Sequence, residues 1–136
     1  MNKIICAFFI LTFSIVNTHS ASFNWIKIGT NGENDTDWYY DPKTAIKVGN
    51  YRYYWTLANF LSNIEDDIYS SIGHHMVNCS TYESKFITYS GYNSPMGRGD
   101  LVYDYIIPEE SLEYFYWIYA DPIEDIYGVL LKEVCK

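Results

Sequence analysis

The sequence predicts an α+β fold: a small antiparallel β-sheet with one C-terminal α-helix that is tethered to it by a disulfide. Short aromatic-rich segments with turn residues between them are typical of β-strands, and the chain contains 15 tyrosines, 7 phenylalanines and 4 tryptophans. The last stretch changes to a helical spacing of apolar residues. Cys79 ends one expected strand and Cys135 ends the expected helix, so a bond between them would hold the helix on the sheet.

The start of the chain predicts an export signal. Lys3 is followed by an uninterrupted apolar run over residues 4–16 and then by small and polar residues, which are the three parts of a secretory signal peptide. The run is too short to span a bilayer core of about 30 Å, and no charged stop follows it, as a retained anchor would need. We expect residues 1–20 to be a signal peptide cleaved after Ser20, with Ser22 as the alternative, and residues 21–136 to form one domain.

Charge restricts the partners of the mature chain. Cys6 lies near the start of the apolar run and not at its end, where a lipid-attachment cysteine would be, so we expect no membrane insertion after signal cleavage. The formal net charge of −8 becomes more negative when Lys3 leaves with the signal. An acidic domain without a basic cluster repels phosphate backbones, anionic lipids and sulfated glycans. We therefore expect no nucleic-acid partner.

The cysteine count favours a single disulfide. Cys6 leaves with the signal, and Cys79 and Cys135 remain as an even pair in an oxidising compartment. Closing the loop between them would contribute about 4 kcal/mol by restricting the unfolded chain. The alternatives are two free thiols or a metal-binding pair.

Alternation and turn residues divide the mature chain into short strands. Residues 23–28 alternate between two faces, and the polar, acidic residues 30–37 are expected to form a loop. Pro42 ends the next strand because proline lacks a ladder donor. Residues 51–60 give the strongest strand pattern, with every second side chain on one face. The expected strands are residues 23–28, 38–41, 44–48, 51–60, 68–79, 85–89, 101–107 and 112–119, with a turn-rich loop over residues 90–99.

The final segment has the apolar stripe of an amphipathic helix. Asp121 suits the N-cap, Pro122 suits the first helical position, and Glu124 completes a capping box. Gly128 within this helix would cost about 1 kcal/mol relative to alanine. The stripe consists of Ile123, Ile126, Tyr127, Leu130, Leu131 and Val134.

An ordered set of short motifs extends over nearly all of the mature chain. It consists of Trp25, Tyr40-Asp41, Ile46, the segment RYYWTL over residues 52–57, Ser70-Ser71, Val77-Asn78-Cys79, Tyr89, Gly97, Gly99, Trp117-Ile118, Pro122 and Val134-Cys135. With this set, the chain resembles the surface-adhesin protein E family of bacterial envelope proteins. The resemblance implies a small antiparallel sheet whose C-terminal helix is held by the same disulfide.

The resemblance also implies a non-enzymatic bacterial surface protein with a role in virulence. The best-known member attaches to host matrix glycoproteins such as vitronectin and laminin, so a protein or glycoprotein partner is implied here. Two features differ from that member: this chain lacks a lipid-attachment site, and residues 79–100 carry only Lys85 and Arg98 as cations against Glu83 and Asp100.

The first candidate binding surface is the turn-rich loop. Arg98-Gly99-Asp100 spells the integrin-recognition tripeptide, and recognition would need Arg98 and Asp100 to point apart from an exposed loop tip. Alternatively, the glycines are present for structural reasons, as in the family pattern. The candidate loop residues are Tyr92, Arg98, Gly99 and Asp100.

The second candidate is an aromatic face of the sheet. A helix on one face leaves the other open, and tyrosines there would bury contact area while keeping a polar group available. The alternative is that most of these rings fill the core. The candidate residues are Tyr51, Tyr53, Trp55, Tyr103 and Tyr105.

We expect no catalytic, metal or cofactor site. His74 and His75 are adjacent on a strand and point to opposite faces, so they cannot easily share a metal. Ser70, Ser71 and His74 lie in no Gly-x-Ser-x-Gly motif. The acidic loop lacks the glycine and the distant glutamate of an EF-hand, and a solvated loop is the simpler interpretation.

Together these observations predict an exported, adhesin-like binding domain that contacts host matrix glycoproteins or another envelope or extracellular protein. The alternative is a periplasmic accessory or structural protein with no host ligand, which self-associates, for instance as a homodimer, through an aromatic sheet face. The expected location is the periplasm, the cell surface or the medium.

Overall fold

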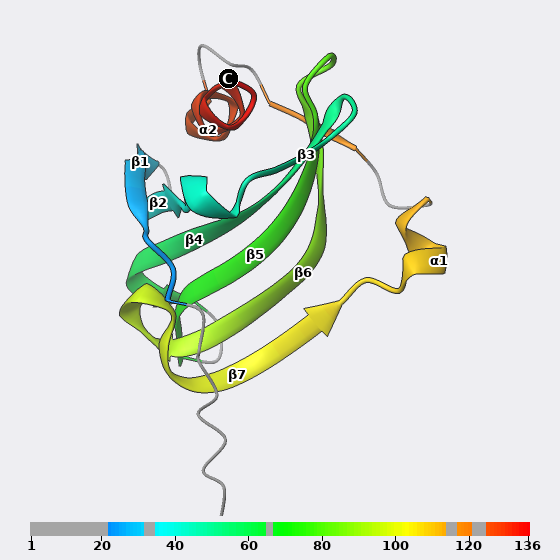
Figure 1. Cartoon of the computed structure of the whole chain (residues 1–136). Coiled ribbons are helices and arrows are strands. Elements are labelled where there is room, and N and C mark those ends of the chain that lie inside the picture. The colour runs from blue at the N-terminus through cyan, green and yellow to red at the C-terminus, as the bar shows by residue number, and fades with distance from the viewer. Residues whose placement is uncertain (1–21, 32–34, 65–66, 114–116, 121–124) are drawn as a thin grey trace, which may run out of the picture.

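A computed structural model describes residues 22–31, 35–64, 67–113, 117–120 and 125–136 (Figure 1). It confirms the predicted fold class, because eight strands form one antiparallel sheet and a C-terminal helix packs on it. The predicted signal peptide lies outside the described residues. Within them, no helix has the length and apolarity to cross a membrane.

The sheet has the strand order β1-β2-β4-β5-β6-β7, with β3 beside β4 and β8 beside β6. The long central strands β4, β5 and β6 curve together, and α2 lies at one end of the sheet above β1 and β2 (Figure 1). The strands are β1 Ile26–Asn31, β2 Thr36–Tyr40, β3 Ile46–Val48, β4 Tyr51–Ile64, β5 Ile68–Asn78, β6 Glu83–Ser94, β7 Arg98–Ile106 and β8 Ile118–Tyr119. The helices are α1 Glu109–Leu112 and α2 Ile126–Val134, with short 3-10 turns at Pro42–Thr44 and Pro95–Gly97.

The core lies between α2 and the sheet. Leu130 and Leu131 of α2 are fully buried against Tyr54 of β4 and Val77 of β5. Burying one such leucine side chain contributes about 1.5–3 kcal/mol. The buried residues of the predicted apolar stripe therefore form the side of the core that the helix contributes.

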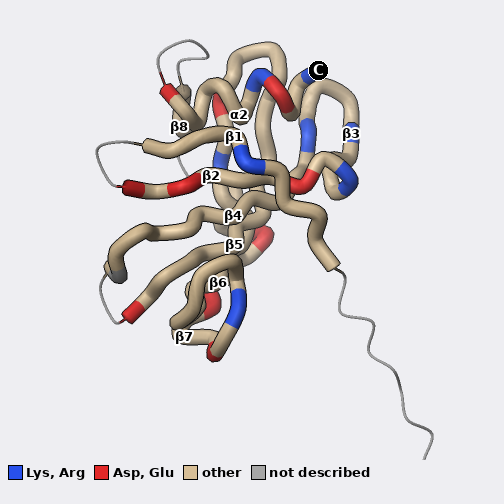
Figure 2. Tube along the Cα trace, turned by 90° about the vertical axis from the view of Figure 1, so that its left-hand side faces the viewer, with Lys and Arg blue, Asp and Glu red and all other residues tan. Residues whose placement is uncertain are grey.

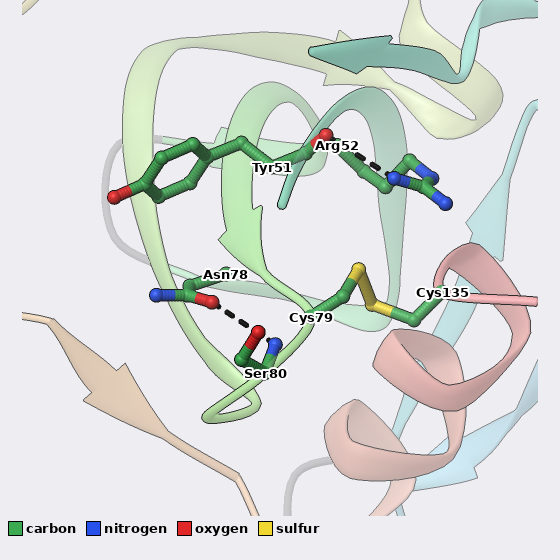
Figure 3. Close-up of a disulfide and its surroundings, with 6 residues drawn as sticks. All are labelled: Tyr51, Arg52, Asn78, Cys79, Ser80 and Cys135. Carbon is green, nitrogen blue, oxygen red and sulfur yellow. Dashed lines mark hydrogen bonds between the residues drawn. A yellow bond between two sulfur atoms is a disulfide. The ribbon is translucent and has the colours of Figure 1, made fainter. Parts of the chain in front are cut away.

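The predicted disulfide is present. Cys79, just after β5, joins Cys135 at the end of α2 with a Cα–Cα distance of 5.5 Å across 56 residues (Figure 3). The backbone N–H of Cys79 donates to the carbonyl of Asn50, so the bond is attached to the turn before β4. The sheet and the helix are thus covalently joined beside the core.

The expected turn-rich loop over residues 90–99 is mostly strand, which corrects the prediction. β6 continues to Ser94 and β7 starts at Arg98, leaving only the Pro95–Gly97 turn between them. Ser70 pairs with Tyr92 and Ser71 with Gly91 in register with β5. Long-range pairing thus extends the strand through small, polar residues that are typical of turns.

Of the expected strand over residues 112–119, only Ile118–Tyr119 is a strand within the described residues, which corrects the prediction. α1 ends at Leu112, and a two-residue strand, β8, follows at Ile118; residues 114–116 lie outside the described part of the chain. Two glutamates occupy the first turn of α1, where negative charge is favourable. The Leu112 carbonyl accepts a hydrogen bond from Lys85 Nζ at 2.7 Å, which fixes the end of this turn on the sheet.

The start of the C-terminal helix is corrected as well. Asp125 is the N-cap, and its carboxylate accepts a hydrogen bond from the Tyr127 N–H at 2.9 Å. The predicted cap Asp121, with Pro122 and Glu124, lies outside the described residues. The helix therefore begins at Ile126, one turn after the predicted start.

Candidate functional site

The two faces of the sheet differ in what covers them. Residues opposite each other on neighbouring antiparallel strands share a face. Tyr54, opposite His75, lies on the helix-side face, which carries α2. Trp55, opposite His74, lies on the other face, which we call the helix-free face.

The predicted aromatic face is divided between these two surfaces. Tyr51, Tyr53 and Trp55 lie on the helix-free face, as alternation along β4 predicted. Tyr103 and Tyr105 stand opposite Gly91 and Tyr89 of β6, on the helix-side face. The prediction of a single face was wrong because the β6–β7 register could not be derived from alternation within each strand.

The helix-free face carries a row of packed rings, the aromatic row, made by Trp25, Phe23, Trp55, His74 and Tyr53. Trp55 stacks on His74 with ring centroids 4.5 Å apart and planes 13° apart. Phe23 packs on Trp55 at 5.6 Å and on Trp25 at 4.6 Å, and Tyr53 contacts His74 at 6.3 Å. All five side chains are partly exposed, so the row is packed ring against ring and still accessible.

A second ring contact continues this face toward β8. Tyr51 stacks on Trp117 at 6.1 Å, and Lys85 Nζ lies 4.3 Å from the centroid of the Trp117 ring. Sequence reasoning missed Trp117 and His74 as members of this surface. Only the pairing register brings His74 beside Trp55, and only the chain after β7 brings Trp117 beside Tyr51.

The Pro95–Gly97 turn folds back onto the helix-free face and is not a free loop tip. The Met96 N–H donates to Asn59 Oδ1 and the Gly97 N–H donates to Ser70 Oγ, both at 2.8 Å. Gly97 has a φ of 65°, and a Cβ there would lie 2.5 Å from Ile72 Cδ1. Gly97 is therefore required by the backbone conformation of the turn and by its close packing on Ile72, which is the structural alternative to a binding role.

Arg98, Gly99 and Asp100 are exposed at the start of β7. Asp100 is attached to β6, because its N–H donates to Asn93 Oδ1 at 2.8 Å and its carboxylate accepts from Asn93 Nδ2 at 3.3 Å. Tyr92 is half-buried and pairs with Leu101. The predicted binding loop is therefore a strand end whose acidic group already has a partner.

The two adjacent histidines point to opposite faces, as predicted. His75 is fully buried: its Nε2 lies 2.7 Å from Thr56 Oγ1 and its Nδ1 lies 2.7 Å from the Tyr127 hydroxyl. Burial lowers the pKa of His75 to about 3, so the ring is neutral. Burial also lowers the pKa of His74.

The other residues considered for chemistry have structural partners. Ser70 Oγ donates to the Ser94 carbonyl at 2.6 Å, and Asp37 forms an ion pair with Lys27 at 2.7 Å. Cys79 is in the disulfide. In the described part of the chain, His, Cys, Asp and Glu form no group of three that could hold a metal.

A hollow on the helix-side face was not predicted. It has a volume of about 360 Å³ and lies beside α2, where Tyr127 contacts Trp38 at 5.7 Å. Its floor includes Thr56 and Gly73. Five aromatic rings from four strands surround it: Trp38, Phe60, Phe86, Tyr89 and Tyr103. We call this hollow the ring pocket.

One antiparallel sheet and one disulfide-held helix define the class: a small α+β domain with aromatic surfaces on both faces of its sheet. The chain belongs to the surface-adhesin protein E family, whose model matches residues 25–136. The crystal structure of protein E from non-typeable Haemophilus influenzae is similar, with 14% identity over 82% of this chain and 74% of that chain and a TM-score of 0.49. A search of curated proteins gives no significant match.

Proposed function

We propose that residues 21–136 form an exported, non-enzymatic binding domain that contacts a protein or glycoprotein through the aromatic row of the helix-free face. Family membership supports an adhesin-type surface protein with a protein partner. Export by the signal peptide of residues 1–20 is part of this proposal. Vitronectin and laminin are the first partners to test, because the family resemblance implies host matrix glycoproteins.

The single observation that carries the proposal is the partly exposed aromatic row on the face that α2 leaves open. Tyrosine and tryptophan dominate the binding energy of many protein interfaces because each buries a large area with few rotatable bonds. Stacking of Trp55 on His74 and its tilted contact with Phe23 hold these rings in place before a partner arrives. Less side-chain entropy is then lost on binding.

The distribution of charged residues also supports the helix-free face as the binding surface. The described residues of β5 include no Asp, Glu, Lys or Arg, and β4 carries only Arg52 of these residue types. Lysine and arginine lie mostly around β3 and the C-terminal end of α2 (Figure 2). The middle of the sheet therefore presents rings to a partner without the repulsion expected from an acidic protein.

The test is binding of oxidised residues 21–136 to immobilised vitronectin and laminin by surface plasmon resonance. Trp55→Ala should weaken Kd at least about tenfold, the usual size for a central aromatic contact. Tyr105→Ala is the matched control, because Tyr105 is 43% exposed on the helix-side face. Equal weakening by both variants, or binding unaffected by Trp55→Ala, would refute the proposed surface.

A negative result with both glycoproteins directs attention to the cell envelope. Protease treatment of intact cells should then remove the protein if it is displayed on the surface and leave it intact if it is periplasmic. Loss under shaving supports an adhesin with another ligand. Protection supports the alternative of a periplasmic protein without a host ligand.

A further inference from the structure

We infer that the ring pocket of the helix-side face is a binding site for a small planar aromatic molecule whose ring carries a hydrogen-bond acceptor. This site lies on the opposite face from the aromatic row and does not depend on the proposed function.

The walls of the ring pocket suit a flat ring. Tyr89 meets Phe86 and Tyr103 edge-on, with centroids 5.8 and 5.5 Å away and interplanar angles of 67° and 72°. Rings held at such angles present both faces and edges to a guest ring. The volume of about 360 Å³ lies at the small end of the range for ligand pockets, which favours a compact ligand of about two fused rings.

Gly73 keeps the floor of the ring pocket open. A Cβ at this position would lie 2.7 Å from His75 Nε2, 3.2 Å from Phe86 Cε1 and 3.4 Å from Thr56 Oγ1. Any larger residue would cover the hydrogen bond between Thr56 and His75. The glycine therefore gives the hollow access to a polar group beneath the apolar walls.

The hydrogen bonds beneath the floor leave one donor for a ligand. The Tyr127 hydroxyl accepts from Ser84 Oγ at 3.4 Å, and the nearest acceptor for its own hydrogen is His75 Nδ1 at 2.7 Å, because the Tyr54 hydroxyl lies farther away at 3.5 Å. A neutral histidine carries one ring hydrogen, which must then be on Nε2 and be donated to Thr56 Oγ1, 2.7 Å away. The tautomer is assigned here from this network.

Thr56 therefore accepts from His75 and keeps its own hydroxyl hydrogen. Thr56 is only 2% exposed and lines the ring pocket. Among the contacts of the described residues, His75 is the partner of this hydroxyl. A buried donor without an acceptor is costly, so a ligand that offers an acceptor there is favoured over one of the same shape that offers a donor.

The other hydrogen-bonding side chains that line the pocket are Trp38, Ser71, Tyr89 and Tyr103, and all four are partly exposed, so solvent can satisfy their donors. Ser71 Oγ and the Tyr103 hydroxyl lie 3.4 Å apart and pair with each other. The specificity of the site therefore depends on Thr56.

The experiment titrates two bicyclic probes into 15N-labelled residues 21–136 at pH 7.5 and follows amide shifts by NMR. Quinoline offers a ring-nitrogen acceptor and no donor, whereas indole offers a donor and no ring-nitrogen acceptor. Quinoline should give saturable shifts centred on Gly73, Phe86 and Tyr89 with a Kd about tenfold lower than that of indole, the value of one neutral hydrogen bond. N-acetyl-tyrosinamide is titrated as a stand-in for the side chain of a protein partner.

Two variants test the donor. Thr56→Val removes the hydroxyl at nearly constant shape and should bring quinoline to the affinity of indole, while Thr56→Ser keeps the hydroxyl and the preference. Equal binding of the two probes to the native protein, or a preference that survives in Thr56→Val, would overturn the inference. Tighter binding of N-acetyl-tyrosinamide than of quinoline would also overturn it, in favour of a pocket for a protein side chain.

Discussion

At the scale of single residues, His75 connects the core to both the helix and the ring pocket. Its ring stacks on Tyr54 with centroids 5.1 Å apart and contacts Phe86 at 4.2 Å. Its nitrogens bond Thr56 on β4 and Tyr127 on α2. No acidic side chain lies among these contacts, and burial, followed by the neighbouring His74, disfavours the charged form of His75. His75 is therefore a neutral structural residue.

The low pKa of His75 predicts that the folded protein loses stability in acid. This pKa is about 3 in the folded protein and about 6.5 in the unfolded chain. Below about pH 6.5 the unfolded chain therefore binds a proton at His75, whereas the folded protein binds this proton only near pH 3. The stability that the neutral ring provides is complete above about pH 6.5 and is lost as the pH falls through this window, by about 2–3 kcal/mol at pH 4.5.

The measurement is urea unfolding at pH 7 and pH 4.5, followed by tryptophan fluorescence. His75→Gln keeps a neutral polar side chain and should show a clearly smaller loss between the two pH values. Asp37, whose pKa is lowered mainly by its hydrogen bond with Lys27, contributes at lower pH and does not interfere. The same pH slope in native protein and His75→Gln would show that His75 is not the source.

At the scale of elements, α2 shows which features of a helix can be predicted. The buried stripe of Leu130, Leu131 and Val134 was correctly predicted, because spacing alone decides which helical side chains share a face. The first residue of the helix was not correctly predicted, because Asp121 and Asp125 are both residues that suit an N-cap. Which one caps depends on where the preceding chain leaves β8, and this is a tertiary property.

Removing the N-cap should destabilise the domain. Asp125→Ala deletes the acceptor of the Tyr127 N–H and should lower the free energy of unfolding by about 0.5–2 kcal/mol. Asp125→Asn keeps a good cap and should lose much less. Chemical denaturation at pH 7 compares the three proteins, and equal losses in both variants would show that charge, and not capping, is the important property.

The strands, like the helix, could be predicted only in the features that local sequence decides. Alternation in β4 placed Tyr51, Tyr53 and Trp55 on one face correctly, since side chains alternate along any strand. The serines, the glycine and the asparagine of residues 90–94 indicated a turn because these residue types favour turns locally. Their pairing with β5 involves residues about 20 positions away, which local composition does not reveal.

At the scale of the whole molecule, one sheet separates two aromatic surfaces. The aromatic row lies on the helix-free face, and the ring pocket lies beside α2 on the other. The disulfide between Cys79 and Cys135 keeps α2 on the helix-side face (Figures 1 and 3). The cysteine pair and the helix were predictable from the sequence, whereas the ring pocket was not, because its walls come from four strands whose order only the fold defines.

Hydroxyl-radical footprinting of residues 21–136, alone and bound to the glycoprotein that it captures, tests the central claim most directly, because solvent-exposed tyrosine and tryptophan rings are oxidised and can be assigned by mass spectrometry. Binding through the helix-free face predicts reduced oxidation of Tyr53, Trp55 and Trp25, with Tyr103 and Tyr105 unchanged. Protection of Tyr103 and Tyr105 with unchanged Trp55 would place the partner on the helix-side face and contradict the account.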